Sequence, residues 1–328
     1  MTPDDYRKDY AAEADRTADQ HRAIQDEVLE GEKSESESRN VPQTGARDYP
    51  APPFPHQTLE KPGHEADLDL QPMYDAPYYK GSDKLKDKAA IITGGDSGIG
   101  RAVAILFARE GADVAIVYLN EHEDAEKTKA LIEAEGRKAI LIPGDVTDRA
   151  FCFDAVEQTV KAFGKLDVLV NNAAFQMHEM DFEKLTPEHF DLTIKTNLYG
   201  YFNMTQAALK HMKKGAAIVN SGSITGIDGS KSIVDYSMTK GGIHAFTRAL
   251  SGQLLAKSIR VNAVAPGPVW TPLNPADKPV EQVEQFGSDT PMKRAAQPEE
   301  LAPAYVFLAS NHCSSYITGE ILPVIGGY

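Results

Sequence analysis

Past residue 86, short runs of β-branched and other apolar residues alternate with longer stretches in which apolar residues recur every three to four positions. The short runs predict buried strands and the longer stretches predict amphipathic helices. Strands are expected at residues 89–93, 113–118, 138–143, 167–170, 216–220, 259–265 and 320–324. Helices are expected at residues 98–110, 122–135, 149–163, 187–213, 236–257 and 298–310. This alternation is typical of a doubly wound α/β fold, with a seven-stranded parallel sheet covered by helices on both faces.

The first 84 residues do not follow this pattern. Residues 1–48 are rich in acids and serine but poor in aliphatic side chains, so they cannot bury enough apolar surface to offset the entropy of ordering. We expect a disordered acidic tail there. Residues 49–84 are rich in proline and tyrosine, which favours an extended arm on the surface of the domain; a solvated linker is the alternative. Residues 85–328 are expected to form a single domain.

Composition excludes several classes of function. The 328-residue chain has 48 Asp+Glu against 34 Lys+Arg, a net charge of -14, whereas nucleic-acid binding requires a basic surface. No apolar run approaches the roughly 18 residues of a membrane span, and the charged start does not resemble a signal peptide. The two cysteines, Cys152 and Cys313, form no Cys/His cluster, so neither a disulfide framework nor a metal site is predicted. These features favour a cytoplasmic protein with no nucleic-acid or membrane partner.

A glycine-rich loop is the sharpest local signal in the chain. The sequence Thr93–Gly100 follows the first predicted strand directly and opens the first predicted helix. Glycines allow a tight turn and let a diphosphate approach the helix N-terminus, where free N–H groups and the helix dipole favour an anion. The loop therefore predicts a dinucleotide site. A turn that merely needs glycine is the alternative.

A tyrosine and a lysine form the second signal. Tyr236 and Lys240 are four residues apart in a predicted helix, so they share one face, and Ser223 lies 13 residues before the tyrosine. Two unit charges about 4 Å apart interact by about 4 kcal/mol at an effective dielectric constant of 20, and about 1.4 kcal/mol shifts a pKa by one unit. We therefore expect Lys240 to lower the pKa of Tyr236 into the range of acid/base catalysis. By itself, such a pair is often a chance surface contact.

Taken together, residues 84–328 resemble the short-chain dehydrogenase/reductase family. The matching segments are the cofactor loop Thr93–Gly100, Asp145-Val146 after the third strand, Asn171–Ala174 after the fourth, the ordered set Asn197, Ser223, Tyr236 and Lys240, and Pro266–Thr271 after the sixth. Two positions depart from the family pattern: Ala174 replaces the usual Gly, and Val-Ile precedes the final glycines where an Asp is common. The long N-terminus further resembles a bacterial subgroup of general stress proteins and glucose/ribitol dehydrogenase-like oxidoreductases.

The resemblance implies a Rossmann-type catalytic domain that transfers a hydride between NAD or NADP and a small alcohol or carbonyl compound, such as a polyol, sugar or aldehyde. Tyr236 would move the proton, Lys240 would hold the nicotinamide ribose, Ser223 would orient the substrate oxygen, and Asn197 would hold a relay water. These four are the implied catalytic residues. The implied cofactor-binding residues are Gly94, Ser97, Gly98, Ile99, Gly100, Tyr118, Asp145, Val146, Asn172, Ala173, Tyr236, Lys240, Pro266, Gly267, Val269 and Thr271. A homotetramer is also implied, and no metal.

Several alternatives stay open at this point. Asn197 could be a helix-interior residue satisfied by the backbone, and Asp145 could merely cap the following helix. The chain could also be a non-catalytic, stress-protective or dinucleotide-binding protein.

The end of the second predicted strand bears on the choice of nicotinamide. An NAD-selective site places a carboxylate there, which binds the ribose hydroxyls and repels a 2′-phosphate. Tyr118 occupies that position, and neither Ser97 nor Leu119 supplies the Arg or Lys of strict NADP enzymes. We therefore expect use of both cofactors with a modest preference for NADP. A shift of register that brought Glu121 or Glu123 to the ribose would restore selectivity for NAD.

Overall fold

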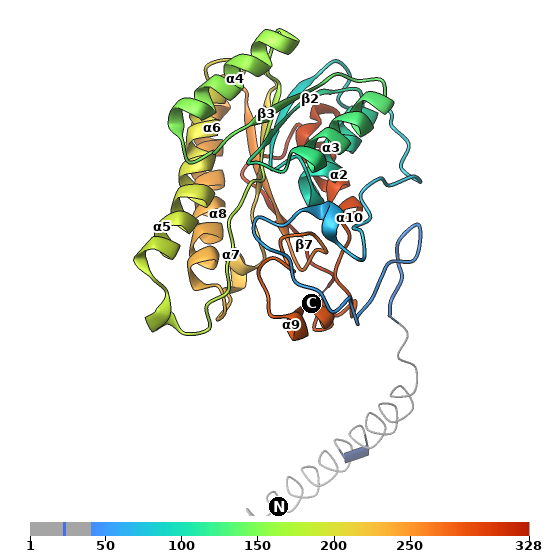
Figure 1. Ribbon diagram of the computed structural model, residues 1–328. Coiled ribbons are helices and arrows are strands. Elements are labelled where there is room, and N and C mark those ends of the chain that lie inside the picture. Colours follow the sequence, from blue (N-terminus) through green and yellow to red (C-terminus); the bar gives the residue numbers. More distant parts are fainter. Residues whose placement is uncertain (1–21, 24–40, 328) are drawn as a thin grey trace, which may run out of the picture. The chain divides into compact units, whose positions relative to one another are not determined.

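The computed structural model describes residues 22–23 and 41–327 (Figure 1). Most of the expected acidic tail, residues 1–48, lies outside the described residues. The unit that carries the fold is Gln43–Tyr328. Its contacts begin at its first residue, because the Gln43 side chain donates to the backbone oxygen of Tyr49 at 2.9 Å and accepts from its N–H at 3.0 Å. The arm that packs on the domain thus starts about six residues before the boundary that composition suggests.

In the described part of the chain, seven parallel strands form one sheet in the order β3-β2-β1-β4-β5-β6-β7. The strands are β1 (Ala89–Thr93), β2 (Asp113–Tyr118), β3 (Ala139–Pro143), β4 (Val168–Asn171), β5 (Ala217–Ser221), β6 (Arg260–Pro266) and β7 (Ile321–Val324). Each begins and ends within one residue of its expected bounds, so the predicted fold class is confirmed. The order reverses between β1 and β4, which is where ligands bind in open α/β sheets.

Helices cover both faces of this sheet (Figure 1). One face carries α2 (Gly98–Arg109), α3 (His122–Ala134) and α10 (Pro298–Ala309), and the other carries α4 (Arg149–Phe163), α6 (Gly200–Ala208) and α8 (Val234–Leu254). Successive strand residues alternate between two apolar clusters: Ile92 and Ile116 join the cluster under α2 and α10, while Ile91 and Val117 join the one under α4 and α6. A parallel sheet buried on both faces requires these continuous apolar strands.

The predicted helix at 187–213 is wrong in its continuity and its end. The structure has α5 (Pro187–Ile194), a π-helical turn η3 (Lys195–Tyr199) and then α6, which ends at Ala208. The extra residue of a π-turn shifts the helical phase at one point, and an overall apolar periodicity over residues 187–213 does not locate that shift. Such turns are frequent at functional sites.

Short elements that the pattern did not predict lie in the loops. They are η1 (Glu65–Asp67), η2 (Phe182–Lys184), α7 (Thr225–Asp228), α9 (Val280–Glu284) and α11 (Asn311–Ser314), whereas η4 (Leu255–Lys257) continues α8 within the helix predicted at 236–257. None of the described helices is both long and apolar enough to cross a membrane.

The arm packs on the segment that follows β6. Phe54 is buried and stacks on the fully buried Trp270 with ring centroids 4.3 Å apart. The Leu59 N–H donates to the oxygen of Pro275 at 2.9 Å, and Trp270 Nε1 donates to the oxygen of Leu70 at 2.9 Å. Described residues of the arm therefore form part of a small core and are not a solvated linker.

Candidate active site

The glycine loop lies between β1 and α2, at the point where the strand order reverses. Gly98 has a φ of +50°, a left-handed conformation that favours glycine. A Cβ on Gly100 would lie 1.8 Å from the backbone oxygen of Gly94, so no side chain fits there. The sequence from Gly94 to Gly100 thus folds into a close turn that presents the N-terminus of α2.

A cavity of about 1010 Å³ opens on this turn and is lined by segments that follow β1 to β6. Its size is at the upper end of the range of about 300–1,000 Å³ for small-molecule pockets. The sequence-predicted residues that line it are Gly94, Ser97, Gly98, Ile99, Tyr118, Asp145, Val146, Asn172, Ala173, Ser223, Tyr236, Lys240, Pro266, Gly267, Val269 and Thr271. Gly100 and Asn197 are the two predicted residues that do not line it.

Helix α8 places Tyr236 and Lys240 on one face toward the cavity. Lys240 is almost completely buried; its Nζ donates to the backbone oxygen of Ser221 at 2.7 Å and lies 5.2 Å from the centroid of the Tyr236 ring. Ser223, just after β5, accepts hydrogen bonds on Oγ from the N–H and the hydroxyl of Thr225, at 3.1 and 3.0 Å. Three side chains with acid/base or hydrogen-bonding capacity therefore meet at one end of the cavity.

The pKa of Tyr236 lies above its usual value of 10, which is opposite to the direction expected from the lysine alone. Burial is the main cause, and the Ser223 hydroxyl opposes it. Burial also lowers the pKa of Lys240 to about 7. The expectation that Lys240 lowers the pKa of Tyr236 was wrong because it counted only the attraction between the two charges, whereas loss of solvation dominates the pKa of both groups.

Asn197 sits in the π-turn η3 and is fully buried. Its side chain accepts from the N–H of Phe175 at 2.8 Å and donates to the Phe175 oxygen at 2.9 Å and to Thr239 Oγ1 at 3.1 Å. The side chain therefore holds the backbone of the loop after β4. This agrees with the alternative stated above, in which Asn197 is a helix-interior residue whose side chain is satisfied by the backbone.

Asp145 and Asn172 are held by short-range contacts beside the cavity. Asp145 Oδ1 accepts from the N–H of Thr147 at 2.8 Å, while Asp148 provides the side-chain cap of α4. Asp145 is therefore not the helix cap, and its exposed carboxylate lines the cavity. The Asn172 side chain donates to the oxygen of Gly94 at 3.0 Å, which ties the loop after β4 to the glycine loop.

Two carboxylates lie near the end of β2. Asp96 and Glu121 are both buried and both line the cavity, together with Tyr118. Burial, with the charge of Glu121 adding to it, raises the pKa of Asp96 to about 7. Glu123 does not line the cavity, so only one of the two glutamates considered above reaches it.

Arg101, which follows the glycine loop, is not among the residues that line the cavity. Its guanidinium is fully buried and pairs with Glu65 of the arm and with Asp124 of α3. It is therefore not placed to bind a phosphate in the cavity.

Sequence reasoning missed a polar cluster in the cavity wall, formed by the arm and the segments after β4 and β6. Lys61 of the arm donates to the oxygen of Gln176 at 2.7 Å, and Lys278 Nζ lies 2.9 Å from Nε2 of His178. His178 Nδ1 in turn lies 2.5 Å from Asp277. These residues come from three segments far apart in the chain and have no common spacing, so no local motif could have indicated them. Among the described residues, no group of three or more His, Cys, Asp or Glu could hold a metal ion.

This doubly wound sheet, with a glycine loop and a Tyr/Lys/Ser set at its switch point, is the architecture of a nucleotide-binding oxidoreductase class. Residues 94–328 match the family described as enoyl-(acyl carrier protein) reductase. The chain belongs to the short-chain dehydrogenase/reductase family and is an oxidoreductase, as the sequence resemblance implied.

Three similar proteins illustrate the match. General stress protein 39 of Bacillus subtilis is 53% identical over 84% of this chain and 96% of its own. The NADPH-dependent aldehyde reductase 1, chloroplastic, of Arabidopsis thaliana is 47% identical over 81% of this chain and 95% of its own. A short-chain dehydrogenase from Burkholderia cenocepacia J2315, crystallised in complex with NADP, has a TM-score of 0.70 and 33% identity, covering 74% of this chain and 98% of that protein.

Proposed function

We propose that the protein uses NAD or NADP to interconvert small alcohols and carbonyl compounds, such as polyols, sugars or aldehydes. The observation that carries the proposal is the meeting of Tyr236, Lys240 and Ser223 with the glycine loop in one cavity. The NADPH-dependent aldehyde reductase and the NADP-bound dehydrogenase among the similar proteins support the cofactor and the reaction type.

The residues around the cavity fit a dinucleotide. The glycine loop keeps side chains away from the N-terminus of α2, whose N–H groups and dipole favour a diphosphate. A Cβ on Gly98 would lie 3.0 Å from Thr271 Cγ2, so the loop and the segment after β6 approach each other closely there. We assign the adenine to Asp145 and Val146, the ribose to Lys240, and the carboxamide to Pro266–Thr271.

When bound, the nicotinamide supplies or accepts the hydride. Ser223 already accepts two hydrogen bonds from Thr225, so its own O–H is the group that it offers to the substrate oxygen. Tyr236 carries its proton at neutral pH, because burial raises its pKa, and it donates that proton to the oxygen during carbonyl reduction. Lys240 is held beside the ring through Ser221, and Asn197 keeps the loop after β4 in place through its bonds to Phe175.

Both cofactors are expected to be used, with a modest preference for NADP. Tyr118 at the end of β2 leaves no carboxylate at the position of the NAD-selective acid, and its hydroxyl lies 2.9 Å from His122 Nδ1. Asp96 and Glu121 nevertheless provide acceptors for ribose hydroxyls, which supports continued use of NAD.

Turnover of a panel of aldehydes, sugars and polyols with each nicotinamide tests the proposal. We expect reduction of aldehydes with NADPH and a weaker rate with NADH. No turnover of any panel member would favour the alternative, a non-catalytic stress-protective or dinucleotide-binding protein. A kcat/KM that favours NADH by more than about 100-fold, near 2.7 kcal/mol, would contradict the cofactor preference.

We also propose that copies of the chain associate as a homotetramer. Large apolar side chains on α5, α6 and α8 are exposed, including Phe190, Phe202 and Met238. Apolar patches of this kind mark interaction surfaces. The cytoplasmic location stays a prediction.

A further inference from the structure

The arm inserts a completely buried acid, Glu65, against the glycine loop. Burying a carboxylate is costly unless it is paired and hydrogen-bonded. Glu65 lies outside the α/β pattern, in the short turn η1, and no catalytic or binding role has been given to it above.

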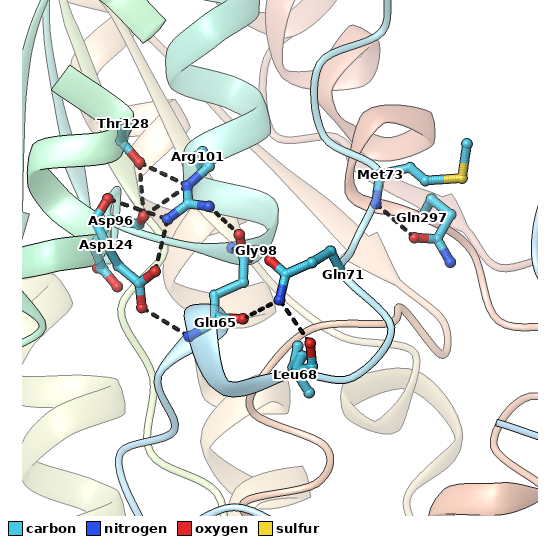
Figure 2. A network of polar contacts seen from close by, with 10 residues as sticks. All are labelled: Glu65, Leu68, Gln71, Met73, Asp96, Gly98, Arg101, Asp124, Thr128 and Gln297. Atoms are coloured by element: carbon cyan, nitrogen blue, oxygen red, sulfur yellow. Dashed lines mark hydrogen bonds and ion pairs between the residues drawn. The ribbon is translucent and has the colours of Figure 1, made fainter. Parts of the chain in front are cut away.

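Each oxygen of the Glu65 carboxylate has its own partner (Figure 2). Oε2 accepts from the backbone N–H of Gly98, the first residue of α2, at 2.7 Å. Oε1 accepts from Nη1 of Arg101, which lies in the first turn of the same helix. The arm thus supplies the partner for one of the N–H groups that a helix leaves unsatisfied at its start.

Arg101 extends this contact to the rest of the loop and to α3 (Figure 2). Its Nε donates to the backbone oxygen of Asp96 at 2.9 Å and to Thr128 Oγ1 at 2.8 Å, and its Nη2 donates to Asp124 Oδ1 at 3.0 Å. The Glu65 N–H donates to the other oxygen of Asp124 at 2.7 Å. The arm, the glycine loop and α3 are therefore joined in one buried network.

Glu65 contacts the glycine loop but is not among the residues that line the cavity. Ser97, Gly98 and Ile99 line the cavity, whereas Glu65 and Arg101 do not. The carboxylate therefore does not occupy the place of a bound diphosphate. It binds the backbone of Gly98, which itself lines the cavity.

We propose that Glu65 is a positioning residue for the dinucleotide: it holds Gly98 and Arg101 so that the start of α2 keeps the geometry that binds the diphosphate. The inference rests on the proposed function. Because coupling between two sites is reciprocal, docking of the arm strengthens cofactor binding, and cofactor binding strengthens docking of the arm.

The substitution Glu65→Gln tests this with almost no change in shape. Glutamine has one acceptor oxygen and an NH₂ group, so it cannot accept from both Gly98 and Arg101 as the carboxylate does. One donor is left facing another donor, and the loop must shift. Asp67→Asn is the matched control, because it makes the same acid-to-amide change on an exposed residue of the same turn.

The affinity of the full-length protein for NADPH, titrated by nicotinamide fluorescence without substrate, is the first measurement. We expect the Kd of Glu65→Gln to rise at least fivefold, while Asp67→Asn stays within twofold of wild type. With saturating NADPH, kcat and the KM for an aldehyde should stay within twofold, which a general loss of structure would not allow. A Kd within twofold of wild type for a folded Glu65→Gln protein would overturn the inference.

Hydrogen exchange of the wild-type protein keeps the inference testable should the variant not fold. Saturating NADPH is expected to slow exchange in residues 62–70 at least threefold, in parallel with the glycine loop. If NADPH protected the glycine loop but left exchange in residues 62–70 unchanged, this inference would be overturned while the proposed function would stand. If the wild type bound neither NADPH nor NADH, the proposed function would fail, and this inference with it.

Discussion

Tyr236 and Lys240 show how burial changes the chemistry of a pair that the sequence places side by side. Their spacing predicts correctly that both lie on one helix face, and they line the same cavity. The spacing does not predict which of the two groups carries a proton. The pKa of each group depends on burial, and residues from distant segments of the chain produce that burial. The raised pKa keeps Tyr236 protonated at neutral pH, so it suits the donation of a proton to a carbonyl oxygen.

Asp96 is expected to make the cofactor preference depend on pH. Burial raises its pKa to about 7, so the carboxyl is mostly neutral at pH 6 and mostly charged at pH 8. A charged carboxylate beside the ribose repels a 2′-phosphate. The ratio of kcat/KM with NADPH to kcat/KM with NADH should therefore fall about fivefold from pH 6 to pH 8. For comparison, a tenfold change in this ratio would correspond to a free-energy difference of about 1.4 kcal/mol.

Asp96→Asn provides the control for this pH dependence. The 2′-phosphate itself titrates near pH 6, and its effect persists in the variant. We expect the ratio to vary less than twofold over the same range in Asp96→Asn. An equal slope in both proteins would show that Asp96 does not set the preference.

Among the elements, the strands, the glycine loop and the extended arm on the surface of the domain were predictable, but the contacts that the arm makes were not. Strands buried on both faces must be apolar throughout, so β1 and β2 stand out in the sequence. The arm depends on pairings such as Phe54 with Trp270, which are more than 200 residues apart and carry no periodic signal. The π-turn around Asn197 was missed for a different reason, because a single shift of helical phase does not interrupt the helical signal of a long stretch.

Phe54→Ala tests how much the arm contributes to the segment after β6. The ring is buried and stacked on Trp270, and removing a buried phenylalanine side chain costs about 3–5 kcal/mol. We expect the free energy of unfolding in urea to fall by about 3 kcal/mol. Phe182→Ala, at a side chain that is 70% exposed, should change it by less than about 0.5 kcal/mol. Equal effects of the two substitutions would contradict the packing role of the arm.

Two truncations test where the arm begins. Removal of residues 1–42 should leave the Tm unchanged, because the compact unit starts at Gln43. Removal of residues 1–80 should lower the Tm by at least 10 °C, because it also removes Arg47, which pairs with the buried Glu299 at 2.8 and 2.5 Å. Loss of one partner leaves an uncompensated buried charge. The same Tm for both truncated proteins, measured by calorimetry, would rule out this boundary.

At the scale of the whole molecule, exposed apolar side chains on α5, α6 and α8 bear on assembly. Phe202 on α6 is 48% exposed and Met238 on α8 is 50% exposed. Light scattering should give a mass about four times the 35.7 kDa of one chain. Phe202→Glu should shift the protein to smaller species, because it places a charge in the proposed interface. A wild-type mass equal to that of one chain would disprove the tetramer.

The central claim is that Tyr236 transfers the proton while the surrounding cavity binds the nicotinamide cofactor. The most direct test compares wild type with Tyr236→Phe for NADPH-dependent reduction of an aldehyde, together with the Kd for NADPH. Phenylalanine keeps the ring and removes only the hydroxyl, so we predict a loss of at least about 100-fold in kcat with a Kd within threefold of wild type. Lys240→Ala should lose both. A Tyr236→Phe protein that retained more than about a tenth of the wild-type kcat would contradict the account.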